Sequence, residues 1–307
     1  MDLTILIPAR NEMFLRETVQ DILKNMRADT EIYVLLDGKW DDPKIPEDPR
    51  VNIIYVPNSI GQRAGQNRCA RLSRAKYVMK ADAHCAFDEG FDRKMLDAFK
   101  ELEDAGETNI TMVPVMRNLH VFDWKCMTCG KRWYMGPDPE KCEDPNCKGT
   151  KFTRRLVWRA KPSPNSTSYR FNKELEFKYF GEYKKKQKGD LVETMSLQGS
   201  CFMATRENYF KNELCDESWG SWGGQGAEVA IKTWLSGGRV ICNRRTYYAH
   251  MFRTQPGFTH PYENPGREQQ KAKGQLREVF LNDAWPKAVR KLDWIVEHFK
   301  PVPDWHD

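Results

Sequence analysis

The stretch MKADAHCAF, residues 79–87, decides how the rest of the chain is interpreted. It begins as an apolar strand and then places Asp82 and His84 two residues apart, where side chains of an extended segment point to the same face. A carboxylate and an imidazole on one face are able to bind one divalent ion such as Mn²⁺, with a third ligand from elsewhere. The alternative is a polar turn after a strand, and the pair by itself does not separate the two.

The segments around this stretch alternate between apolar strands and amphipathic helices. The strands end at Pro or Asp-Gly, and the helices repeat their apolar residues at helical spacing. This alternation predicts an α/β layered sheet, in which ligands bind at the carboxyl ends of the strands. The expected strands are 3–9, 31–38, 50–57, 76–82 and 109–119, and the expected helices are 11–26, 61–75 and 91–106.

The bulk composition is that of a globular protein rather than a membrane-spanning or secreted one. The chain has 307 residues, of which 40% are hydrophobic, and it contains no apolar run of 18 residues. Its first residues lack the basic head and small-residue cleavage site of a signal peptide. We therefore expect a cytoplasmic protein without a membrane span, and the sequence gives no oligomeric state.

Four of the nine cysteines form two close pairs, Cys126-x2-Cys129 and Cys142-x4-Cys147. Two such pairs are able to hold one tetrahedral Zn²⁺, and four cysteine ligands leave no open coordination position, so the site is expected to be structural. Four free thiols or a redox pair is the alternative. The other five cysteines are interpreted as small buried residues.

Positive charge is concentrated in the segment that contains these pairs. Residues 124–188 carry 17 Lys and Arg against 7 Asp and Glu, a balance of +10 in a chain whose net charge is +6. Basic and aromatic residues together suit a nucleic acid, although a solvated basic knuckle that supports an active-site wall is an alternative. We expect a nucleotide-binding half at 1–123, a zinc-ribbon insert at 124–152, and the remainder of the main domain at 153–307 with the acceptor side, a closing loop and C-terminal helices.

The order of the motifs resembles the glycosyltransferases of the GT-A fold within the family 2-like group. The closest resemblance is to the catalytic domain of the polypeptide N-acetylgalactosaminyltransferases. It is carried by TILIPARNE, VLLDG, the segment 61–87, QGSCFMATRENYF, SWGGQGAEVAIKTWLSGGRV and YYAHMFR, and it covers about 3–118 and 190–285. It implies an α/β GT-A fold with a mixed central sheet, interrupted here by the four-cysteine zinc-ribbon insert.

The resemblance also implies a metal site and a donor site. His250 becomes the third ligand beside Asp82 and His84, for Mn²⁺ or Mg²⁺, where a core histidine was the alternative. A UDP-sugar is the implied donor, and a cation on its diphosphate would neutralise the charge of the leaving group. The residues assigned to the donor by this resemblance are Pro8, Arg10, Glu12, Asp37, Arg63, Asn67, Gly199, Gly223, Gly224, Arg253, His260 and Tyr262.

The motif WGGQGAE, residues 222–228, departs from the family pattern at its first acid. Trp222 and Glu228 match and are assigned to catalysis together with Gln225, which stands where the family has a glutamate. A glutamine donates hydrogen bonds but is no general base. We favour retention of configuration by front-face attack, whereas an inverting route would need Glu228 or Asp216 as base.

These features predict a metal-dependent glycosyltransferase that moves a sugar from a UDP-sugar to a hydroxyl group. The basic insert favours hydroxymethylated pyrimidines in DNA as the acceptor. A protein or a polysaccharide precursor is the alternative acceptor. A non-catalytic nucleic-acid-binding protein on a decayed transferase fold is the alternative class.

Overall fold

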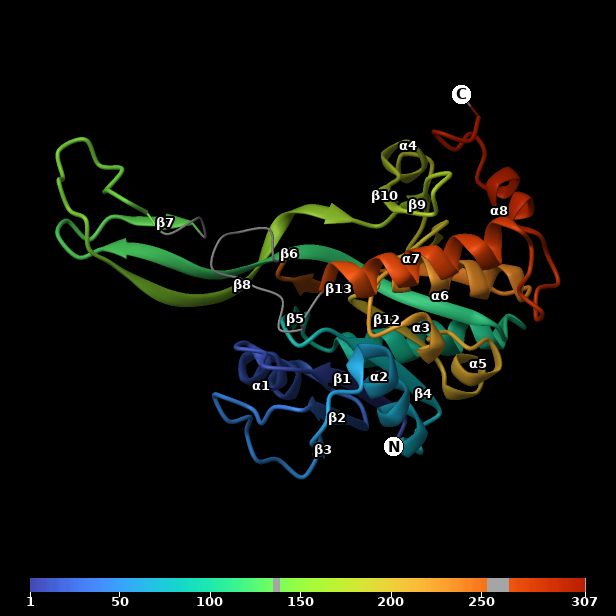
Figure 1. The fold of residues 1–307 in the computed structure, drawn as a ribbon, viewed down its shortest axis with the longest axis horizontal. Coiled ribbons are helices and arrows are strands. Elements are labelled where there is room, and N and C mark those ends of the chain that lie inside the picture. Colours follow the sequence, from blue (N-terminus) through green and yellow to red (C-terminus); the bar gives the residue numbers. More distant parts are fainter. Residues whose placement is uncertain (135–138, 253–264, 307) are drawn as a thin grey trace.

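A long, mixed β-sheet forms the centre of the computed structural model, which describes residues 1–134, 139–252 and 265–306 (Figure 1). Its main path runs in the order β11-β13-β6-β12-β4-β1-β2-β3. The strands of this path are β1 (Leu3–Ala9), β2 (Thr30–Asp37), β3 (Val51–Val56), β4 (Tyr77–Ala81), β6 (Ile110–Cys126), β11 (Leu191–Glu193), β12 (Cys201–Thr205) and β13 (Arg239–His250).

The N-terminal part of the sheet is parallel, as the strand and helix alternation predicts. Strand β1 pairs in parallel with both β2 and β4, and β2 pairs in parallel with β3. Strand β12 is antiparallel to both β4 and β6, so the sheet becomes mixed at this point. The expected α/β architecture with a mixed central sheet is confirmed.

Helices cover both faces of the sheet because successive strand residues point to opposite sides. Leu3, Ile5 and Ile7 of β1 lie in one apolar cluster, while Leu6 lies in the other. The helices are α1 (Leu15–Asn25), α2 (Gly61–Leu72), α3 (Phe91–Asp104), α4 (Gly181–Lys184), α5 (Arg206–Lys211), α6 (Gln225–Leu235), α7 (Pro265–Leu281) and α8 (Leu292–His298), with a 3₁₀ turn, η1, at Glu217–Trp219. Among the described residues, no helix is long and apolar enough to span a bilayer.

Strand β6 is longer than its sequence pattern indicates and leaves the body of the protein. The apolar run predicts an end near residue 119, but β6 continues to Cys126 because β7 (Arg132–Tyr134) and β8 (Phe152–Ser166) pair with it there. These strands form an arm that extends away from the body (Figure 1). The remaining strands are β5 (Cys85–Phe87), which pairs with β13, and the hairpin of β9 (Tyr169–Phe171) and β10 (Phe177–Tyr179).

A buried group of charges joins α2 to α6. Glu228 is fully buried and forms ion pairs with Arg63, also buried, and with Lys232 at 2.8 Å. It also accepts a hydrogen bond of 2.9 Å from the backbone N–H of Asp216. Breaking such a pair leaves an uncompensated buried charge, which costs far more than breaking an exposed pair.

We expect Glu228→Gln to lower the free energy of unfolding by about 3–5 kcal/mol, because Arg63 and Lys232 would lose their buried counter-ion. Urea unfolding at neutral pH measures the change. The control is Glu101→Gln, which removes an exposed pair with Arg245 and should leave the unfolding midpoint almost unchanged. Equal midpoints for the two variants would contradict a structural role for the buried group.

Candidate active site

A cavity of about 560 Å³ lies at the carboxyl ends of β1 and β4, where sheets of this kind bind ligands. Its volume is in the range of ordinary small-molecule sites. Eleven of the residues predicted from the sequence line it: Pro8, Arg10, Glu12, Asp82, His84, Gly199, Trp222, Gly223, Gly224, Gln225 and His250.

The predicted metal ligands come together at one edge of this cavity. Asp82 and His84 lie between β4 and β5, and β5 pairs antiparallel with the end of β13, so that Cys85 faces His250. One ligand atom from each of Asp82, His84 and His250 lies within 4.8 Å of the others. The strand pairing therefore supplies the distant third group that the local pattern required.

The two carboxylate oxygens of Asp82 face different partners. Oδ1 accepts hydrogen bonds from the ammonium of Lys80 and, at 3.2 Å, from Gln62. Oδ2 lies 3.1 Å from Nε2 of His250 and 3.9 Å from Nε2 of His84. One oxygen is thus fixed by protein donors, while the other points at the two imidazoles.

These partners set the charges of the cluster. Burial opposes ionisation of Asp82, but the Lys80 ammonium and the hydrogen bond from His250 outweigh it, so the pKa of Asp82 lies well below its usual range. Burial lowers the pKa of His250 to about 4. An ionised carboxylate and a neutral imidazole are the forms in which these groups bind metals.

Glu12 orients the second imidazole. Its Oε2 lies 3.2 Å from Nδ1 of His84, and the Glu12 side chain is 7% exposed. A carboxylate on one ring nitrogen fixes the tautomer and directs the other nitrogen at the metal. The arrangement of one oxygen and two nitrogen ligands with such support fits a divalent cation of the Mn²⁺ type.

The glycine loop before α6 forms another wall of the cavity. Gly223 and Gly224 have left-handed backbone angles, φ +106° and +64°, which favour glycine. A Cβ on Gly199 would lie 2.9 Å from the backbone N of Gly226, so the close approach of two backbones explains the glycine there. Trp222 lines the cavity beside these residues.

Arg63, Asn67 and Glu228 do not line the cavity. Arg63 donates to the carbonyl oxygen of Gly223 at 2.6 Å and to Glu228, and so holds the loop from behind. Asn67 donates to the carbonyl oxygen of Cys215 at 2.8 Å. Direct contact of these three side chains with a donor does not fit this geometry, because all three are buried under the loop.

Asp37 and Gln225 are held by protein partners as well. Asp37 is fully buried, and its carboxylate accepts hydrogen bonds from Ser59 and from the backbone N–H groups of Ile60 and Gly61, at the start of α2. Gln225 lines the cavity, yet its amide nitrogen donates to Gln66 at 2.7 Å. The turn interpretation of Asp37 agrees with this geometry.

Several cavity residues were not predicted from the sequence. Lys80 lies within a buried strand and donates to the carbonyl oxygen of Gly199 at 2.6 Å. Glu176 and Lys273, joined by an ion pair of 2.8 Å, also line the cavity. A charged residue inside an otherwise apolar strand is the one sequence signal that pointed to Lys80.

Three residues that the sequence assigned to the donor, Arg253, His260 and Tyr262, lie outside the described residues.

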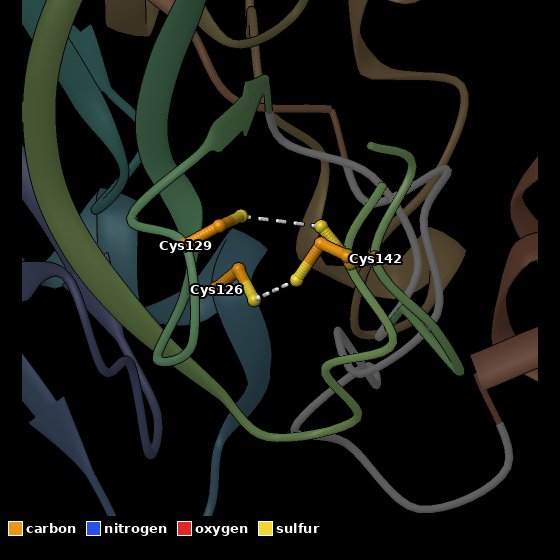
Figure 2. A group of neighbouring side chains, drawn as sticks. Cys126, Cys129 and Cys142 are labelled. Carbon is orange, nitrogen blue, oxygen red and sulfur yellow. Dashed lines mark hydrogen bonds between the residues drawn. The ribbon is translucent and has the colours of Figure 1, made fainter. Parts of the chain in front are cut away.

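The four paired cysteines also converge, near the end of the arm. Sγ of Cys129 lies 3.5 Å from that of Cys142 (Figure 2). Sγ of Cys126 lies 3.8 Å from that of Cys147. A tetrahedron with metal–sulfur bonds of ~2.3 Å has sulfur–sulfur edges of roughly 3.8 Å, so the spacing fits one Zn²⁺. Backbone N–H groups of Cys129 and Thr128 lower the pKa of Cys126 to about 6, which favours its thiolate, whereas burial raises the pKa of Cys142.

We expect purified protein to contain about one zinc per chain, in keeping with a four-cysteine site. Cys129→Ala should abolish this zinc and make the arm sensitive to proteases, as measured by elemental analysis and limited proteolysis. Cys69→Ala removes a buried cysteine elsewhere and should leave the zinc content unchanged. Equal zinc content in both variants would argue against the site.

The chain is similar to known proteins in sequence and in fold. Residues 4–114 match the family model of Glycosyl transferase family 2. The chain shares 24% identity over 246 residues, 80% of its length, with the putative polypeptide N-acetylgalactosaminyltransferase 13 of Drosophila melanogaster, and 27% over 99 residues, 30% of its length, with polypeptide N-acetylgalactosaminyltransferase 3 of the same species. It spans only 37% and 15% of these two relatives.

Solved structures show the same fold. The crystal structure of GalNAc-T7 with UDP, GalNAc and Mn²⁺ matches 92% of this chain, and 49% of its own, with a TM-score of 0.65 at 15% identity. Staphylococcus aureus TarS matches 97% of the chain, and 43% of its own, with a TM-score of 0.53 at 11% identity.

The solved structures show that the chain has a GT-A fold, and residues 4–114 are similar to the Glycosyl transferase family 2 model. Within that class, it is similar to the catalytic domain of the polypeptide N-acetylgalactosaminyltransferases.

Proposed function

We propose that this protein is a divalent-metal-dependent glycosyltransferase that moves a sugar from a UDP-sugar to a hydroxyl acceptor. The observation that carries the proposal is the cluster of Asp82, His84 and His250 in the cavity, supported by Glu12 and Lys80. The neighbour GalNAc-T7 was crystallised with UDP and Mn²⁺, which fits this donor and this cation.

The residues of the cavity have separate tasks in this reaction. A divalent cation held by Asp82, His84 and His250 would neutralise the diphosphate as it leaves. Lys80 and Gln62 keep the Asp82 carboxylate in one orientation, and Glu12 does the same for His84. Arg10, whose guanidinium donates to the backbone oxygen of Asp37 at 2.8 Å, adds positive charge to the cavity wall.

Retention of configuration is the stereochemical course that we propose. The acceptor oxygen bonds to the anomeric carbon on the face from which the diphosphate departs, and the acceptor proton passes to a departing phosphate oxygen. Glu228 is fully buried between two cations, and Asp216 does not line the cavity and accepts from Ser218 at 2.7 Å. Neither carboxylate that the sequence suggested as an inverting base is placed to act as one.

The acceptor that we propose is a hydroxymethylated pyrimidine in DNA. The concentration of basic residues in the arm segment supports a polyanionic acceptor. The names of the relatives support a polypeptide acceptor instead, and they make it the second candidate.

We also propose zinc at the four cysteines and a cytoplasmic location, because thiolates that bind zinc need a reducing compartment.

We expect Asp82→Asn to reduce Mn²⁺-dependent release of UDP from a UDP-sugar by at least about 100-fold, because loss of a group that stabilises developing charge typically has this effect. UDP release from a panel of UDP-sugars measures donor turnover, and calorimetry measures Mn²⁺ binding. His298→Gln is the control, since His298 contacts Glu193 on the far side of the fold at 2.9 Å. Equal rates for wild type and Asp82→Asn would defeat the proposal that the protein is an enzyme.

The acceptor is tested with duplexes that contain 5-hydroxymethylpyrimidine, matched to duplexes that lack the hydroxyl group. We expect only the hydroxymethylated duplex to gain the mass of one glycosyl unit in nucleoside mass spectrometry. A serine- and threonine-rich polypeptide in a parallel reaction serves as the competing acceptor. Transfer to the polypeptide but not to the DNA would overturn the DNA proposal and leave the glycosyltransferase proposal intact.

A further inference from the structure

The arm has two faces of different chemistry. Its strands alternate, and residues directly opposite each other in neighbouring strands share a face. Trp124 of β6 faces Trp133 of β7 and Arg154 of β8. Lys125 of β6 faces Arg132 of β7, and the neighbouring Asp123 faces Arg155 of β8.

The face that carries the tryptophans packs on itself. Phe122 and Trp124 make an edge contact with ring centroids 5.6 Å apart, and Trp133 makes another with Phe152 at 5.7 Å. The guanidinium of Arg154 lies over the ring of Phe122 at 5.3 Å. These rings are therefore engaged with each other and do not form an open platform for unstacked bases.

The opposite face of the arm carries unpaired cations. We call it the charged face and define it by Lys125, Arg132 and Arg155. All three side chains are exposed. In the part of the chain that the structure describes, no carboxylate pairs with them, because Asp123 hydrogen-bonds His120 at 2.7 Å instead. Lys125 and Arg132 lie directly opposite each other, and like charges in such positions are destabilising, so an anion bound to this face would stabilise it.

The arm is tied to the active site through one strand. Asn118 of β6 lies in register with the ligand His250 of β13, and Lys125 is seven residues further along β6. At ~3.3 Å per strand residue this is at most roughly 23 Å, because the pairing of β6 with β8 shifts register in this stretch. The separation corresponds to about seven base pairs of duplex DNA at ~3.4 Å each.

We propose that the charged face of the arm binds the phosphate backbone of a DNA duplex and so presents a base about seven pairs away to the cavity. This inference rests on the proposed function, since it names the surface that recruits the DNA acceptor. A β-ribbon fits the major groove, and the C5 substituent of a pyrimidine projects into that groove. Because the aromatic rings are engaged, duplex backbone rather than single-stranded bases is the ligand that this surface suits.

The test is a triple variant, Lys125→Gln with Arg132→Gln and Arg155→Gln. Its matched control is Arg68→Gln with Arg93→Gln and Lys100→Gln, which removes three exposed charges from helices of the body. Fluorescence anisotropy with a labelled duplex at several salt concentrations measures binding. Zinc content and Mn²⁺-dependent UDP release confirm that the arm and the active site are intact.

We expect the triple variant to bind the duplex at least about tenfold more weakly than wild type at low salt. The slope of log K against log salt should fall by about one for each lost phosphate contact, and so by about three. The control variant should keep the wild-type slope, and all three proteins should release UDP at the same rate. Transfer to hydroxymethylated duplex should fall in the triple variant alone.

Unchanged DNA affinity and slope in the triple variant would overturn the inference. Binding of wild type to an acidic polysaccharide but not to the duplex, at the same ionic strength, would overturn it in favour of a different polyanion. If instead the proposed glycosyltransferase function is wrong, wild type would release no UDP, whatever its affinity for DNA. This result differs from both outcomes above.

Discussion

The pairing of β13 with two other strands is the constraint on which the site depends. At its end, β13 lies between β5, which follows the Asp82 and His84 pair, and β6, which continues into the arm. A shift in the register between Asn243 and Tyr247 separates the regular first part of the strand from its end, and such irregularities re-aim the residues beyond them. The same ladder thus positions His250 beside Asp82 and His84 and sets the start of the arm.

Buried charge is used in two different ways near the cavity. Arg63, Glu228 and Lys232 compensate one another under the glycine loop, so they fix its backbone without reaching the cavity. Lys80 neutralises only one oxygen of Asp82 and leaves the other toward the histidines. The first group supplies rigidity, while the second orients the carboxylate that we propose as a metal ligand. Both are costly to disturb because the charges are out of water.

The arm separates two properties that the sequence presented as one. Basic and aromatic residues are mixed along residues 124–161, which suggests a surface where charge and rings act together. Strand pairing sorts them instead, with Trp124, Trp133 and Arg154 on one face and Lys125, Arg132 and Arg155 on the other. The cysteine cluster lies near the end of these strands, where a bound metal would keep β7 and its Arg132 in place.

Local pattern in the sequence by itself determined the alternation of strands and helices and the two cysteine pairs, because each depends on spacings of a few residues. It also indicated that Asp82 and His84 lie close together, although the two residues lie in a turn between β4 and β5 and not on one face of an extended strand. The match of the motifs to a known family added His250. Only the tertiary structure decided that Arg63, Asp37 and Glu228 serve the protein's own backbone and charges, and that Lys80 reaches the cavity. These outcomes depend on burial and on partners far away in the chain, for example Arg63 and Glu228, which are 165 residues apart. Local spacing in the sequence does not predict on which side of a loop a long side chain lies, because that depends on the elements packed against the loop.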